Sequence, residues 1–153
     1  MKYTIEFFRV ILISIEVLCC VIIGALYLWT PSAFEFVGLS VKSNDEALKW
    51  LPALPIALCG YSTHLAWKIL NPSDDSNKDL HGWPEYWRLK LRTYVSLFFS
   101  GLAVFASVSI WLFATNLSGV HAGVLLIATI AVAVVNATCM LLAAFTIREI
   151  TEK

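Results

Sequence analysis

The sequence predicts an all-α integral membrane protein in which four transmembrane helices form an antiparallel bundle. Of its 153 residues, 59% are hydrophobic and only 14% are charged, whereas a soluble domain carries charge on about a quarter of its residues. The apolar residues gather in runs of about twenty, the length that a helix needs to cross ~30 Å of hydrocarbon. We therefore expect residues 1–153 to form a single transmembrane domain.

The apolar runs define four spans, at about residues 7–29, 50–70, 94–115 and 120–147. Pro31 ends the first run, because the residue before a proline avoids helical angles. Pro52 and Pro55 open the second, and prolines cost little in a first turn, where the backbone N–H has no helical partner. Only residues 116–119 separate the last two runs, so we expect these helices to form an antiparallel hairpin.

The distribution of basic residues predicts the orientation. With four spans, nine of the 11 lysines and arginines lie on one side, namely Lys2, Arg9, Lys68, Lys78, Arg88, Lys90, Arg92, Arg148 and Lys153. Only Lys42 and Lys49 lie on the other side. The positive-inside rule therefore places both termini and a long loop, residues 71–92, in the cytosol, and a shorter loop, residues 31–49, outside. The compact chain and its short N-terminal tail favour a multi-pass protein of a bacterial inner membrane.

Charge, cysteine usage and motifs argue against several classes of protein. The formal net charge is zero, which gives no indication of direct nucleic-acid binding. The four cysteines lie inside apolar runs, so we interpret them as small buried hydrophobic residues and expect neither disulfides nor a zinc site. Asp75, Asn77 and Asp79 resemble the start of a calcium loop, but the glycine and glutamate that such a loop requires are absent. No catalytic or cofactor motif is present, so we expect a non-enzymatic protein without metal or cofactor.

Glu16 is the main candidate for an intramembrane site. It lies about ten residues inside the first run, ~15 Å from the boundary and near the bilayer midplane. A carboxylate there must be paired, face water or be protonated, because its burial in hydrocarbon costs several kcal/mol. Asn136 lies at a similar depth in the fourth span, so a hydrogen bond to Glu16 is sterically reasonable. His64 could join this site but lies nearer the cytosolic boundary. The cluster is either a proton or cation site or an interhelical clamp.

The lead-in to the third span combines aromatic and basic residues, the pattern of a helix that lies at the membrane interface. Its candidate residues for docking a partner or anionic lipid are Lys78, Trp83, Trp87, Arg88, Lys90 and Arg92. Small residues recur four apart in the third and fourth spans, as Ser96 and Ser100, Ala103 and Ser107, and Ala133 and Ala137. Such spacing lets membrane helices approach closely, within one chain or between subunits, and a homo-oligomer is expected.

The segment Ile15-Glu16-Val17 resembles the first helix of the small multidrug resistance transporters, whose single membrane glutamate exchanges protons for cationic drugs. The long second loop, the greater length and the strong charge bias depart from that family. The general architecture, without a shared motif, is similar to that of short four-helix membrane subunits of bacterial phage-defence operons such as Kiwa. That similarity implies a role in antiviral defence and a cytosolic partner.

We therefore expect a non-enzymatic subunit, an anchor or sensor that contacts membrane lipids and docks a cytosolic protein through residues 71–92. The alternative is a small proton- or cation-coupled transporter or channel that uses Glu16. Charge reversal between Lys78 and Arg92 should abolish partner recruitment under the first hypothesis and leave activity intact under the second.

Overall fold

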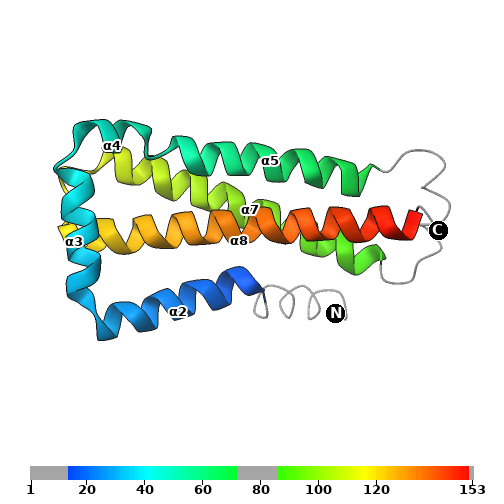
Figure 1. Ribbon diagram of the computed structural model, residues 1–153, viewed down its shortest axis with the longest axis horizontal. Helices are drawn as coiled ribbons and strands as arrows, with labels where there is room; N and C mark the ends of the chain where they lie inside the picture. Colours follow the sequence, from blue (N-terminus) through cyan, green and yellow to red (C-terminus); the bar gives the residue numbers. More distant parts are fainter. Residues whose placement is uncertain (1–13, 72–85, 152–153) are drawn as a thin grey trace, which may run out of the picture.

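The computed structural model describes residues 14–71 and 86–151, and every regular element in these ranges is a helix (Figure 1). The helices are α2 (Ile15–Trp29), α3 (Pro31–Lys42), α4 (Asp45–Trp50), α5 (Ala53–Leu70), α7 (Tyr86–Leu112) and α8 (Gly119–Thr151). Four of them, α2, α5, α7 and α8, extend along the long axis of the molecule, whereas α3 lies across one end (Figure 1). The all-α prediction is confirmed for the described residues.

Two helices, α7 and the part of α8 up to Ile147, are long and apolar enough to cross a membrane. A third span results if α2 and α3, which are bent by 102° relative to each other, count as one. Helix α5 does not meet this criterion, because Tyr61, His64 and Lys68 lower its hydropathy. The chain thus has the helices of a membrane protein, with two or three candidate spans among its described residues.

Residues 31–49, which we expected to form a loop, are mostly helical. Pro31 occupies the first helical position of α3, where its missing N–H costs nothing and its fixed φ suits a helix. Asn44 caps α4, because its side-chain oxygen accepts hydrogen bonds from the backbone N–H groups of Glu46 and Ala47, each 3.1 Å long. The predicted loop is therefore corrected to two short helices, which lie with the α7–α8 connection at what we call the α3 end (Figure 1).

Helix α3 packs on the start of α8 through glycines. A Cβ atom on Gly38 would overlap the backbone of Gly119 and Gly123, and a Cβ on Gly123 would overlap the carbonyl of Phe34. Lys42 adds a hydrogen bond of 2.6 Å from its Nζ to the carbonyl oxygen of Leu117. The spacing of Gly119 and Gly123, four apart in an apolar helix, was a signal for this contact that our sequence analysis did not use.

The small residues of the third and fourth predicted spans are used inside the chain. All six are buried, namely Ser96, Ser100, Ala103, Ser107, Ala133 and Ala137. Ala103 of α7, for example, belongs to one apolar cluster with Val132 and Ala133 of α8, against which Leu58 of α5 packs. The small residues therefore let α5, α7 and α8 pack closely against one another within one chain.

The four cysteines are free and none is fully buried. Cys20 is exposed and Cys19, Cys59 and Cys139 are partly exposed. The expectation that they are buried hydrophobic residues is thus corrected, because their side chains lie partly on the outer surface of the helices, where apolar groups of a membrane protein contact lipid.

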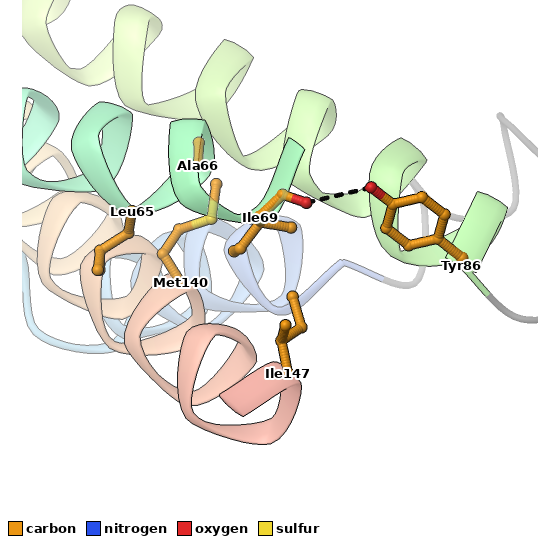
Figure 2. Close-up of a cluster of buried hydrophobic side chains, with 6 residues drawn as sticks. All are labelled: Leu65, Ala66, Ile69, Tyr86, Met140 and Ile147. Carbon is orange, nitrogen blue, oxygen red and sulfur yellow. Dashed lines mark hydrogen bonds between the residues drawn. The ribbon is translucent and has the colours of Figure 1, made fainter. Parts of the chain in front are cut away.

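An apolar cluster closes the other end of the molecule, where α5 and α8 stop and α7 starts, which we call the Tyr86 end (Figure 1). Figure 2 shows its buried side chains, which are Leu65, Ala66, Ile69, Tyr86, Met140 and Ile147. The Tyr86 hydroxyl donates a hydrogen bond of 3.3 Å to the carbonyl oxygen of Ile69, in the last turn of α5. This bond satisfies one of the terminal carbonyls of α5 and fixes the start of α7 against it.

We expect Tyr86→Phe to lower the free energy of unfolding by about 1 kcal/mol, because the substitution leaves the buried Ile69 carbonyl without this donor. The measurement is reversible unfolding in mixed detergent micelles. Tyr94→Phe is the matched control on the same helix, since the Tyr94 side chain is 58% exposed. Equal stability of the two variants would contradict a contribution from this bond.

Candidate functional site

Glu16 is buried among helices although it carries an ionisable group. It lies in the first turn of α2, two residues after Ser14, whose hydroxyl oxygen accepts a hydrogen bond of 3.3 Å from the Val17 N–H and caps the helix. Only 4% of Glu16 is exposed. Helix α2, which carries Glu16, packs against α8.

Glu16, Ser96 and Asn136 form a hydrogen-bonded group that we call the polar cluster. The Ser96 hydroxyl of α7 donates to Oε1 of Glu16 over 2.9 Å. The Asn136 amide of α8 donates from Nδ2 to the backbone carbonyl oxygen of Ser96 over 2.7 Å. The structure thus brings Glu16 and Asn136 together, as the sequence suggested, but Ser96 mediates the link.

The polar cluster joins three helices at one point. Asn136 is fully buried, and its second polar atom, Oδ1, has no hydrogen-bond partner. A carboxyl group and a free amide oxygen are both acceptors, so the cluster offers oxygen atoms that suit a proton or a hard cation. The same hydrogen bonds also serve as an interhelical clamp, since each one links different helices.

The contact with Ser96 gives the position of Glu16 along α7. Ser96 lies four positions after Arg92, which is about 6 Å along the axis of α7. The apolar part of α7 begins only at about Tyr94, so Ser96 lies near its start. The polar cluster also brings Glu16 to the level of Asn136, near the middle of the predicted fourth span, so a position of Glu16 near the bilayer midplane stays a prediction.

A cavity of about 300 Å³ lies beside the polar cluster, between the start of α2, the first half of α7 and the second half of α8. Ser96 and Arg92 contribute its polar wall. The remaining wall comes from Ile15, Leu89, Thr93, Cys139, Met140, Leu142, Ala143 and Thr146. Glu16 is not among the lining residues, but its carboxyl group accepts a hydrogen bond from Ser96, which is one of them.

His64 does not belong to the polar cluster. Its side chain lies on α5 and is exposed, and α5 packs on α7 and α8, whereas Glu16 belongs to α2. The nearby Ser62 is fully buried and its hydroxyl has no hydrogen-bond partner. The spacing along α5 alone could not show which of these two polar residues turns inward.

The predicted docking residues lie partly outside the described part of the chain. Lys78 and Trp83 lie outside the described residues. The other four, Trp87, Arg88, Lys90 and Arg92, lie in the first two turns of α7. Trp87 is 52% exposed, and Arg88 and Arg92 are exposed as well. The Lys90 ammonium lies 4.5 Å from the centre of the Tyr86 ring, a cation–π contact that anchors this side chain.

Comparisons of the chain with protein-family models, with curated proteins and with solved structures find no match. The class of protein therefore follows from the fold itself, as an all-helical membrane protein with a polar cluster at the junction of α2, α7 and α8.

Proposed function

We propose that the chain is a non-enzymatic membrane subunit, an antiparallel bundle with four spans, that anchors or senses through a cytosolic protein partner. The spans are α2 with the apolar residues before it, α5, α7 and α8, and α3 lies in the outer interface. The Tyr86 end faces the cytosol and presents residues 71–92 to the partner. A multi-pass protein of a bacterial inner membrane fits this arrangement.

The lengths of the helices and their aromatic residues support four spans. Helix α5 has 18 residues, a length of ~27 Å, which is close to the ~30 Å of a hydrocarbon core. Trp50 just before α5 and Trp67 near its end are 75% and 69% exposed. On α7, Tyr94 and Trp111 are 58% and 44% exposed and lie ~26 Å apart along the axis. Exposed rings at two such levels are typical of the aromatic belts of membrane proteins.

The observation that carries the docking proposal is the base formed at the Tyr86 end. The hydrogen bond between Tyr86 and Ile69 fixes both ends of the segment that connects α5 to α7. The buried cluster beneath it adds contacts with Met140 and Ile147 of α8 (Figure 2). A connecting segment whose ends are fixed on a packed base, and which is followed by exposed basic residues, suits recognition of an acidic protein surface.

The topology is tested with single cysteines in a chain in which Cys19, Cys20, Cys59 and Cys139 are replaced by alanine. We expect a membrane-impermeant maleimide to label Asn116→Cys in intact cells and to label Asn71→Cys only after the inner face is opened. Both positions are exposed, so access to reagent rather than burial decides the result. Labelling of both cysteines from the same side would contradict this topology, in which a single span, α7, separates the two positions.

The docking function is tested by charge reversal at the start of α7. The double variant Arg88→Glu and Lys90→Glu is expected to abolish recruitment of the cytosolic partner, whereas Lys49→Glu at the α3 end should leave it unchanged. Retained recruitment in the double variant would contradict docking through this surface. Membrane insertion of each variant serves as the control, checked by the amount of protein in the membrane fraction.

The second candidate is a small proton- or cation-coupled transporter or channel that uses Glu16. The unpaired Oδ1 of Asn136 beside the Glu16–Ser96 hydrogen bond favours it, because a mobile proton or cation would use a free acceptor. Under this candidate, purified protein in liposomes should conduct protons down a pH gradient, and Glu16→Gln should abolish the flux.

Homo-oligomerisation stays a prediction. The small residues that suggested it are buried between helices of one chain, so they do not favour an interface between copies. The mass of the detergent-solubilised protein tests it.

A further inference from the structure

We propose that the cavity between α2, α7 and α8 binds one anionic phospholipid from the leaflet at the Tyr86 end, with its phosphate on Arg92 and an acyl chain along the apolar wall. This site shares Arg92 with the surface proposed to dock a protein partner, but it requires only that the chain lies in a membrane.

The size and the wall of the cavity suit an acyl chain. A volume of about 300 Å³ is far larger than the roughly 10–15 Å³ that a single water molecule needs, so the cavity has room for part of an acyl chain. Leu89, Met140 and Ala143 contribute apolar surface. The two threonine hydroxyls of the wall donate to carbonyl oxygens of their own helices, Thr93 to Leu89 over 2.9 Å and Thr146 to Leu142 over 3.0 Å. Their hydrogen-bonding capacity as donors is therefore already used.

The charge of the cavity suits an anion. Arg92 is the cationic residue of its wall, and no carboxylate of the described residues forms an ion pair with it. Glu16, the nearby acidic group, accepts a hydrogen bond from Ser96 and does not line the cavity. A guanidinium group binds phosphate through two parallel hydrogen bonds, so a phosphate at the mouth of the cavity would be a suitable counter-ion for Arg92.

The position of the cavity favours a lipid over a soluble phosphate. Ile15 and Leu142, which line the cavity, are 42% and 60% exposed, so the cavity meets the apolar outer surface of the helices. Arg92 lies only two positions before Tyr94, whose exposed ring is of the kind that sits at headgroup depth. A phospholipid is the ligand that has both an anionic headgroup at this level and a chain that enters an apolar space.

The test is native mass spectrometry of the full-length protein titrated with phosphatidylglycerol or phosphatidylcholine. We expect one phosphatidylglycerol to bind, and Arg92→Gln to weaken it by about tenfold or more, as for the loss of a hydrogen-bonded charge. Arg88→Gln is the matched control, because Arg88 lies one turn earlier on α7 and does not line the cavity. Equal binding of both lipids, or equal affinities of the two arginine variants, would overturn the proposal.

A second pair of variants tests the cavity itself. Ala143→Phe should fill it and abolish binding, with Ala143→Leu as a milder filling variant if the first does not fold. Thr138→Phe on the exposed side of α8 should leave binding unchanged. Unchanged binding in both Ala143 variants, or displacement of the lipid by an excess of inorganic phosphate, would overturn the assignment of a phospholipid.

Discussion

Replacing Gly38 with leucine is expected to lower the free energy of unfolding by about 3 kcal/mol, the upper end of the usual range for overpacking a tight contact. The reason is the contact of α3 with α8. A Cβ at position 38 would overlap the backbone of Gly119 and Gly123, and backbone atoms of a helix cannot move aside as a flexible side chain does. Helix α3 must therefore leave α8 or carry the strain.

Unfolding in mixed micelles, followed by tryptophan fluorescence, measures this effect. Gly101→Leu on α7 is the matched control, because a Cβ there has no heavy atom within 4 Å and the residue is exposed. We expect the control to change stability by no more than about 0.5 kcal/mol. If Gly38→Leu is as stable as the control, the close approach of α3 to α8 is contradicted.

Removing the carboxyl group of Glu16 is expected to have the second largest effect, and its size depends on the replacement. Glu16→Ala should lower the free energy of unfolding by about 2–3 kcal/mol, because it leaves the buried Ser96 hydroxyl without its acceptor and opens a void. Glu16→Gln keeps an oxygen that can accept from Ser96, so it should cost less than about 1 kcal/mol.

The two Glu16 variants also separate the two proposed functions. Under the clamp interpretation, partner recruitment and expression follow stability, so Glu16→Gln behaves nearly as the unchanged protein. Glu35→Ala, an exposed position on α3, is the control for a general effect of losing an acidic residue. A Glu16→Gln variant that is stable yet inactive would contradict a purely structural cluster and favour the transporter.

Much of the fold is predictable because it depends on apolar runs. The predicted starts and ends of the spans at α5 and α8 differ from those of the helices by only a few residues. Helix α7 joins the predicted third span, from residue 94, to the helix predicted in its lead-in, whose basic and aromatic residues from Tyr86 on are compatible with a helix but lower the hydropathy. Helix α3 was not predicted, since Glu35 and Lys42 interrupt its apolar pattern and its stability depends on the tertiary contact with Gly119 and Gly123.

The candidate site was predictable only in part. Glu16 was predictable because ionisable groups are scarce in the apolar runs. Asn136 was predictable because residue counts along the first and fourth spans place it at a depth similar to that of Glu16. The role of Ser96 as the link depends on how α7 is rotated about its axis, which residue spacing alone does not fix. The rotation of α5 about its own axis likewise decides that Ser62 rather than His64 turns inward.

The most direct test of the central claim is the mass of the intact complex after mild-detergent purification of the tagged chain from its native membrane. The anchor account predicts a cytosolic protein bound in a fixed ratio, which is absent when Arg88 and Lys90 are both replaced by glutamate and present with Lys49→Glu. A complex that contains only copies of this chain, in all three preparations, would contradict the account.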